Sequence, residues 1–343
     1  MKAIIIAISI LGFLFSTPSK LKAQSASKIY LEHFFDIYVP IQKDMWALTV
    51  SISKEHSPAD IASKKSILTK TLRAQRSKVK ASPNFENDST LRLQVLHWLN
   101  TTSRILGGDY NYLIQLKNSA KLSPENMREY LKFKEVMNKS YKRNNEQLKK
   151  VVDNFSAKNN LNVNEENNKL STKLNKANNA FNYYDKIYLS FFDAYYYEAL
   201  FNTAVNSRSY VKIEQAKSEL EKQIIKSQNE LINTGSFETD KKLNQAAQNI
   251  IKSYENMMNS YGNDIYKLYK TKHDLDSVKT VVSAKSAFER TPEDVALYNS
   301  LVKNYNAQAP SISSKTQQFN SSRKAALNQW NIAVDIFINE HVL

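Results

Sequence analysis

The side chains best suited to metal chemistry in this sequence are its five histidines: His33, His56, His97, His273 and His341. A di-iron helical bundle needs a Glu three residues before a His on two of its helices, and no histidine here has one. Two histidines, at 33 and 273, have an aspartate three residues later, a spacing that puts both side chains on one helix face. We expect these two pairs to be ordinary surface pairs. The sequence therefore predicts no metal site.

The absence of Cys and the scarcity of Gly exclude several other kinds of catalytic, metal-binding and cofactor-binding site. The chain has no Cys and only 5 Gly among its 343 residues. Without Cys it cannot form disulfides, thiolate zinc sites or thiolate nucleophiles, and it cannot carry the lipid-modified Cys of a bacterial lipoprotein. The glycines lack the spacing of a dinucleotide loop, a phosphate loop or a nucleophile elbow. We expect no cofactor and no catalytic motif. A Ser-His-Asp triad assembled in space stays open as an alternative.

Two aspartates stand inside predicted apolar helix faces. Asp36 and Asp193 both occur in the pattern Phe-Phe-Asp-x-Tyr, and a carboxylate on such a face must be paired or hydrogen-bonded. Three consecutive tyrosines follow Asp193 and point in three directions on a helix, so at least one should be exposed or meet a neighbour. We expect structural roles for these side chains, with a ligand or interface surface as the alternative. That surface would contain Asp36, Tyr38, Asp193, Tyr195, Tyr196 and Tyr197.

The positive charge is concentrated in the first half of the chain. The net charge is +15, from 48 basic and 33 acidic residues; residues 24–162 hold 23 basic and 13 acidic side chains, and residues 163–343 hold 22 and 20. At 100° per residue, one arc of a predicted helix carries Lys65, Arg73, Arg76 and Lys80. These residues are candidates for non-specific binding of an anionic polymer or lipid headgroup. A solvated helix surface is the plainer interpretation, and we expect no sequence-specific nucleic-acid binding.

The elements that would position these residues are long helices. Only 5 Gly and 7 Pro are present, so there are few corners, and apolar residues recur at helical spacing. Ser or Thr followed by Pro predicts helix starts at Ser57, Ser123 and Thr291, and Asp88 and Asp240 are expected to cap two further helices. We expect Pro40 to kink a helix and Pro310 to interrupt one. The fold class is predicted to be all-α.

Several short segments recur in the same order, which indicates an internal duplication. The pairs are Lys28–Leu31 with Lys186–Leu189, Phe34–Tyr38 with Phe191–Tyr195, Phe85–Asp88 with Phe237–Asp240, Ser123–Asn126 with Thr291–Asp294, and Tyr141 and Phe155 with Tyr305 and Phe319. Loop-length changes would explain the small drift in their offsets. The sequence thus predicts two tandem, duplicated four-helix-bundle-like units, at residues 24–160 and 161–343.

The N-terminus has the features of a secretory signal peptide over residues 1–23. A lysine is followed by an apolar run too short for a good membrane span, and Ala23 provides a small residue before a cut at Gln24 or Ser25. An uncleaved anchor is the alternative. We expect an exported mature chain without a transmembrane span, located in the periplasm, at the cell surface or outside the cell.

The segment Ser82–Arg92, SPNFENDSTLR, lies between a basic predicted helix and one that contains Trp98. A small apolar residue, Phe, an acid, Asp and Leu-Arg at such a junction resembles a family of uncharacterised bacterial exported or surface proteins that are all-helical and have no assigned activity. The resemblance covers the first half well and the second, through Phe237–Leu243, more loosely. It implies a surface or periplasmic location and transfers no catalytic residues. Many family members are lipoproteins, which this chain is not.

These observations favour an exported, non-catalytic helical protein with an interaction or structural role at the bacterial cell envelope. One alternative is a ligand-binding module for an anionic polymer or a small molecule, and another is an envelope enzyme whose site has no recognisable motif. The expected partner is another envelope protein, an anionic glycan or a lipid headgroup.

Overall fold

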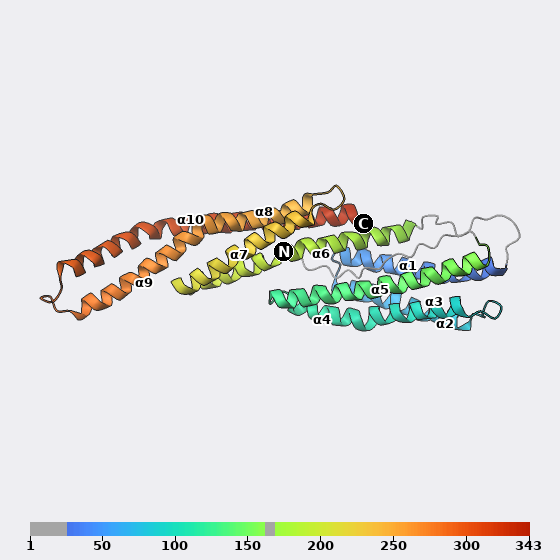
Figure 1. The fold of residues 1–343 in the computed structure, drawn as a ribbon. Coiled ribbons are helices and arrows are strands. Elements are labelled where there is room, and N and C mark those ends of the chain that lie inside the picture. Colours follow the sequence, from blue (N-terminus) through green and yellow to red (C-terminus); the bar gives the residue numbers. More distant parts are fainter. Residues whose placement is uncertain (1–25, 162–168) are drawn as a thin grey trace. The chain divides into compact units, whose positions relative to one another are not determined.

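A computed structural model of the protein describes residues 26–161 and 169–343, and the regular elements of this part of the chain are all helices (Figure 1). Ten α-helices and two five-residue π-helices form eight continuous rods, because each π-helix joins two α-helices end to end. The described residues contain no strand and two isolated bridges. The all-α prediction is confirmed. The expected signal peptide, residues 1–23, lies outside the described residues.

None of the helices in the described part of the chain combines the length and the apolar character needed to cross a membrane.

The described chain packs as two compact units. We call residues 26–161, 169–185 and 336–343 the N-terminal unit, and residues 186–335 the C-terminal unit. The division falls inside a helix, between Asp185 and Lys186, whereas the sequence suggested residue 160. The first part of that helix belongs to the N-terminal unit because its side chains are bonded there: Gln42 donates a hydrogen bond to Ser171, and Asp185 pairs with a buried lysine of the same unit.

The N-terminal unit begins with five α-helices and one π-helix. They are α1 (Ala26–Ser53), α2 (Pro58–Ala81), α3 (Thr90–Arg104), η1 (Ile105–Asp109), α4 (Tyr110–Ala120) and α5 (Pro124–Lys158). Helix α1 packs on α2, and α5 packs on both α3 and α4. The largest fully buried side chains include Trp98, Tyr130 and Tyr141. The core is therefore built mainly from aromatic and aliphatic side chains at helical spacing, as the sequence predicts.

The remaining helices are α6 (Lys169–Asn206), α7 (Tyr210–Thr234), α8 (Lys242–Met257), η2 (Met258–Gly262), α9 (Asn263–Ala284) and α10 (Pro292–His341). Helices α6 and α10 each have residues in both units, with α6 from Lys186 onward and α10 as far as Asp335 in the C-terminal unit. There α7 packs on α8 and α9. Its core contains Phe191, Tyr254 and Trp330.

The predicted helix starts are confirmed. The backbone N–H groups of Asp60 and Asn126 donate to the hydroxyls of Ser57 and Ser123, each at 3.2 Å, which satisfies two otherwise free donors of α2 and α5. Pro310 does not interrupt its helix, because α10 is continuous from Pro292 to His341. Pro310 is exposed, so the carbonyl that loses its intrahelical donor can bond to water.

Each unit has the same kind of tight turn between its second and third rods. Antiparallel bridges close the turns Phe85–Asp88 and Phe237–Asp240, and their second residues, Glu86 and Glu238, have φ values of 51° and 53°. The closing aspartate accepts a hydrogen bond from the backbone N–H two residues later, at 2.9 Å in the first turn and 2.8 Å in the second. Each aspartate thus accepts a hydrogen bond from the first N–H of the next helix. The N-cap positions themselves are occupied by Ser89 and Lys241, so the predicted caps are displaced by one residue.

The third rod of each unit contains a π-helix. In the N-terminal unit, Gly107 and Gly108 fall inside η1, and the rod continues through α4. In the C-terminal unit, η2 joins α8 to α9 in the same manner. A π-turn accommodates one additional residue within a helix. The two glycine-containing segments therefore alter the path of the rods without breaking them.

A buried hydrogen bond in the N-terminal unit gives a test of the packing. The Trp98 indole N–H donates to Asn145 Oδ1 at 2.5 Å, and both side chains are buried. We expect Asn145→Leu to reduce the free energy of unfolding by about 1–3 kcal/mol, because the indole N–H would remain buried without its acceptor. Gln147→Leu, at an exposed position of the same helix, should change it by less than about 0.5 kcal/mol. Urea unfolding measures both, and equal effects would contradict this packing.

Candidate functional site

Of the four residues predicted to bind anions, the structure places one in a contact between two helices and leaves the other three exposed. The Lys65 ammonium donates a hydrogen bond to Asn111 at 2.5 Å and lies 4.7 Å from the ring centroid of Tyr110. Its partial burial lowers the pKa of the Lys65 ammonium. Lys65 therefore serves the contact between α2 and α4. The other three members are exposed along α2: Arg73, Arg76 and Lys80.

The two aspartates of the repeated Phe-Phe-Asp pattern have different surroundings. Asp36 is exposed, whereas Asp193 is buried and forms an ion pair with Lys226 at 2.8 Å. Tyr38 is a core residue whose ring meets that of Trp98 edge to face, with centroids 5.2 Å apart. The shared pattern therefore produces a solvated carboxylate in one unit and a structural ion pair in the other.

The three consecutive tyrosines are all partly buried. Tyr195, Tyr196 and Tyr197 each retain some exposure, and the rings of Tyr196 and Tyr197 meet edge to face with centroids 5.6 Å apart. None of the three is fully exposed. They line part of α6 and do not form a protruding aromatic surface.

The two His/Asp pairs remain surface features. His33 Nε2 lies 2.7 Å from Ser82 Oγ, and Asp36 is exposed beside it. His273 is exposed, while Asp276 forms an ion pair with the lysine four residues before it. In both pairs one side chain is already bonded to another residue, as expected for a surface pair.

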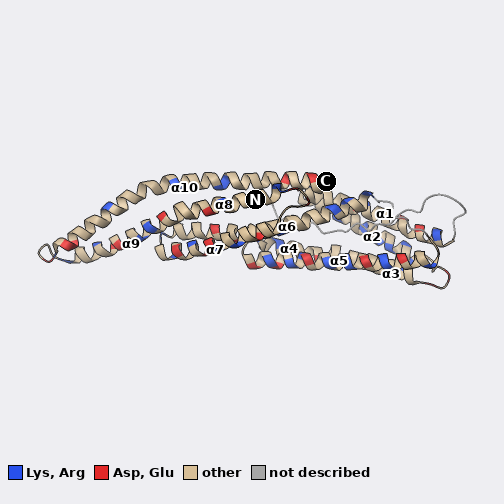
Figure 2. Ribbon diagram, turned by 45° about the horizontal axis from the view of Figure 1, so that its top comes forward, with Lys and Arg blue, Asp and Glu red and all other residues tan. Residues whose placement is uncertain are grey.

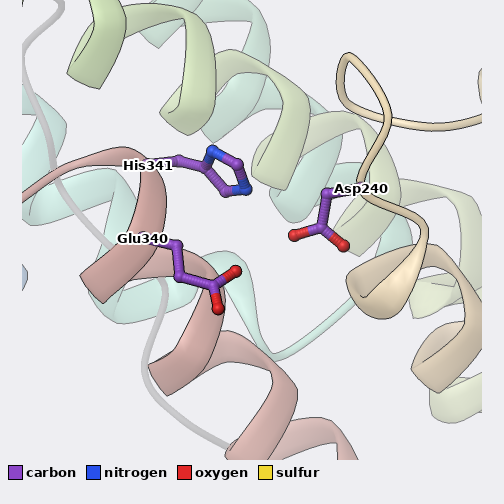
Figure 3. Close-up of side chains that lie close together, drawn as sticks. All are labelled: Asp240, Glu340 and His341. Atoms are coloured by element: carbon purple, nitrogen blue, oxygen red, sulfur yellow. The ribbon is translucent and has the colours of Figure 1, made fainter.

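Figure 3 labels three more side chains of types that bind divalent metals, Asp240, Glu340 and His341. Asp240 closes the turn before α8 in the C-terminal unit. Glu340 and His341 belong to the last turn of α10, in the N-terminal unit, where the His341 ring packs against Phe337 with centroids 4.8 Å apart. Because they come from different units, we assign no metal site to them.

A buried ion pair in the C-terminal unit was not predicted. Glu198 is 0% exposed, and one of its carboxylate oxygens accepts a hydrogen bond from Arg323 Nε at 2.9 Å. Asn202 donates to the other oxygen. Burial raises the pKa of the Glu198 carboxyl, and the Arg323 charge opposes part of that rise. Burial, together with the Glu198 charge, also raises the pKa of Tyr254. The pair is thus a costly structural element inside the core.

The N-terminal unit has a comparable pair. Lys134 is 1% exposed and its ammonium lies 2.6 Å from Asp185 Oδ2. Burial raises the pKa of the Asp185 carboxyl, and the Lys134 charge lowers it in part. The helical periodicity contained a signal for both pairs, because three of the four charged residues, Glu198, Arg323 and Lys134, fall on apolar stripes. The stripes are Phe191, Ala194, Glu198 and Phe201; Phe319, Arg323, Ala326 and Trp330; and Met127, Tyr130, Lys134 and Met137.

The most distinctive surface of the C-terminal unit is the hairpin formed by α9 and α10. Two Lys–Asp ion pairs tie the helices together, Lys315 with Asp264 near the base and Lys285 with Asp294 near the tip, the latter at 2.6 Å. The two ties are 21 residues apart on both helices, since 285 − 264 and 315 − 294 are equal. The helices are therefore antiparallel rods in register. The hairpin extends beyond α7 and α8 (Figure 1).

The outer part of this hairpin has no core of its own. Residues 271–311, all of them described, include no buried residue, and we call them the arm. The ring of Tyr210, the first residue of α7, contacts the ring of His273 with centroids 4.9 Å apart, which marks where α7 begins to cover α9. Beyond that point α9 has α10 beside it. A pair of helices can shield only one face of each.

Most of the half-buried positions of the arm follow heptad spacing, the pattern of a coiled coil. Those that do are Thr271, Leu275, Val278 and Val282 on α9, Lys285 directly after it, and Asp294, Tyr298, Leu301, Tyr305 and Gln308 on α10. Other apolar side chains remain outside this seam. The exposed fraction is 56% for Val281, 45% for Val295, 52% for Leu297 and 102% for Phe288, which lies in the loop at the tip.

The arm is electrically neutral. Residues 271–311 contain five basic and five acidic side chains, and Figure 2 shows both signs on α9 and on the outer part of α10. The net charge of +15 therefore resides entirely in the rest of the chain. A surface that combines neutrality with exposed apolar residues is typical of a protein contact rather than of an anion-binding surface. The sequence itself contained a signal for the arm, namely a heptad pattern that begins at Thr271 and resumes after Pro292.

Comparisons of the chain with protein-family models, with curated proteins and with solved structures found no match.

The buried pair of the C-terminal unit predicts a pH-dependent stability. We expect Arg323→Met to lower the free energy of unfolding by about 3 kcal/mol at about pH 7, because it leaves the Glu198 carboxylate charged and unpaired. Removing Arg323 also raises the pKa of Glu198 further above its ordinary value of 4.5. The loss exists above that raised pKa and disappears as the pH falls through it, so it should be smaller at acidic pH than at about pH 7.

Urea unfolding at the two pH values measures the effect. Lys270→Met removes the surface pair with Asp274, in which both side chains are well exposed, and it should cost far less stability than Arg323→Met at either pH. A loss for Arg323→Met that is equal at both pH values would show that Glu198 is not the group left unpaired.

Proposed function

We propose that this protein is an exported, non-catalytic interaction protein of the bacterial cell envelope, and that its arm joins it to a second copy of the same chain. The arm carries the proposal: it is a stretch of 41 residues, 271–311, that includes no buried side chain and exposes apolar ones. Two-helix arms of this kind complete a core when two of them combine into a four-helix bundle.

We also propose that the two units arose by duplication of one helical unit. In support, each unit has a tight bridge turn between its second and third rods and a π-helix within its third rod. Ser57 and Ser209 accept hydrogen bonds from the N–H three residues later, at the start of the second rod in each unit. The fourth rods begin at Pro124 and Pro292, each after a capping hydroxyl.

The arm is the main difference between the proposed copies. Helix α4 has 11 residues and α9 has 22, while α5 has 35 and α10 has 50. The two helices of the second hairpin are thus longer by 11 and 15 residues, which is about 16 and 22 Å of helix. Tyr141 and Phe155 lie 17 and 31 residues after Pro124, whereas Tyr305 and Phe319 lie 13 and 27 residues after Pro292, so the proposed match keeps only the 14-residue spacing within each pair. Lengthening of both helices by similar amounts is what a functional extension of a hairpin requires.

A second copy is the partner favoured by charge. Two copies of the basic N-terminal unit would repel each other, because residues 24–162 hold 23 basic and only 13 acidic side chains. Two neutral arms would meet without net repulsion. The exposed Val281, Val295 and Leu297 lie within about two turns of the arm's end and would be removed from water in such a contact. Burying them provides the driving force for association.

Mass measurement in solution tests the proposed function. We expect the mature chain to be a dimer at micromolar concentration by light scattering coupled to size exclusion. The double substitution Phe288→Ser and Leu297→Ser should make the chain monomeric, because the contact between two arms would then no longer bury these two apolar side chains.

The matched control is Ile232→Ser in α7, which removes a side chain that is 69% exposed outside the arm. It should leave the dimer intact, and the helical circular dichroism of all variants should be unchanged. A monomeric wild-type chain, or a dimer that persists in the arm variant, would overturn the proposal.

Export gives a separate prediction. We expect the chain recovered from bacteria to begin at Gln24 or Ser25, because a signal peptidase cuts after a small residue that follows an apolar run. Ala23→Leu should block that cut. Intact-mass spectrometry of the membrane and soluble fractions measures both. Recovery of the wild-type chain with residues 1–23 still attached would contradict cleavage and favour an N-terminal anchor.

A further inference from the structure

The C-terminal unit contains an open groove of about 520 Å³ between α8, η2 and α10. It begins at Asn249 and continues along α8 to Ser260 in η2, a distance of about 16 Å at 1.5 Å per residue. Its floor contains Met257, Tyr261 and Phe319, all of them buried. The groove lies outside the arm and has no part in the function proposed above.

Two features of the sequence open this groove. Where α8 and α10 face each other, several side chains are small, namely Ser253 on α8 and Ser322, Ala325 and Ala326 on α10. At one end, η2 brings Tyr261 next to Phe319, with ring planes 8° from parallel and centroids 6.3 Å apart. The result is a trough with an apolar floor between two helices.

The walls of the trough are rich in neutral hydrogen-bonding groups. Four carboxamides line it, from Asn249, Asn256, Gln318 and Gln329, together with several serine hydroxyls. Ser253 Oγ is buried and has no hydrogen-bond partner among the described residues. A carboxamide offers a donor and an acceptor at the same position, which suits a ligand whose hydroxyl groups also do both.

The charge of the groove is positive. No residue that the structure places in its lining carries a carboxylate, and the lining includes two lysines. Lys315 is already paired with Asp264, whereas Lys252 is exposed on the wall formed by α8. An acidic group on the ligand would therefore find one ammonium within the groove.

From this chemistry we propose that the groove binds a short acidic oligosaccharide. Its hydroxyl groups would exchange hydrogen bonds with the carboxamides, its ring faces would cover the apolar floor, and one carboxylate would pair with Lys252. An extended peptide is the less suitable occupant, because the walls that would face its side chains consist mainly of carboxamide, hydroxyl and ammonium groups.

Isothermal titration of the full mature chain tests the proposal with three probes of defined composition: a tetramer of galacturonate, a neutral glucose tetramer and an acidic tetrapeptide of equal charge. We expect the galacturonate tetramer to bind most tightly. Lys252→Ala should weaken its binding about tenfold, the factor for one charge-assisted contact, and should leave that of the neutral tetramer unchanged.

A groove-filling variant separates this site from the rest of the basic surface. Ser322→Phe places a ring in the trough and should abolish binding. Ser321→Phe makes the same change at the exposed neighbouring position, which is not part of the lining, and should have no effect. Arg76→Ala, on α2, should also leave binding intact.

Three results would overturn the proposal: no binding of the galacturonate tetramer, binding that survives Ser322→Phe, or equal binding of the acidic peptide. Each is independent of the mass measurement, because the arm residues do not line the groove.

Discussion

An amphipathic helix is stable in water only when its apolar face lies against another apolar surface, and this requirement governs the whole molecule. Most rods meet it within their own unit, where side chains such as Trp98 and Trp330 are fully buried. The arm does not, because over residues 271–311 each helix shields only one face of the other. Its exposed apolar side chains are therefore the part of the protein that remains to be covered.

The cores of both units contain charge, which burial makes costly. Lys134 with Asp185 and Arg323 with Glu198 each place a carboxylate of raised pKa against a cation. Such pairs add little net stability compared with apolar packing, but an unpaired member would be strongly unfavourable. They consequently favour one register of α5 or α10 against α6 within each unit, since a slip would leave a charge alone.

Much of the fold could be predicted from residue periodicity and helix caps, because these depend on local interactions. Ser57 and Ser123 cap helices as their sequence positions indicate. The continuity of α10 through Pro310 could not be predicted, since it depends on which side of the helix faces water. The role of Glu198 depends equally on Arg323, 125 residues away. The structural role of Lys65, which was predicted to bind anions, also depends on residues distant in sequence, because only the fold brings Asn111 and Tyr110 to its ammonium.

Completion of the arm by the arm of another copy can be measured by hydrogen exchange along residues 271–311, followed by mass spectrometry at low and high protein concentration, because this method reports on the arm itself. We expect exchange in the arm to slow as the concentration rises, while exchange in α2 and α7 does not change. Exchange in the arm that is the same at every concentration would contradict completion by a second copy.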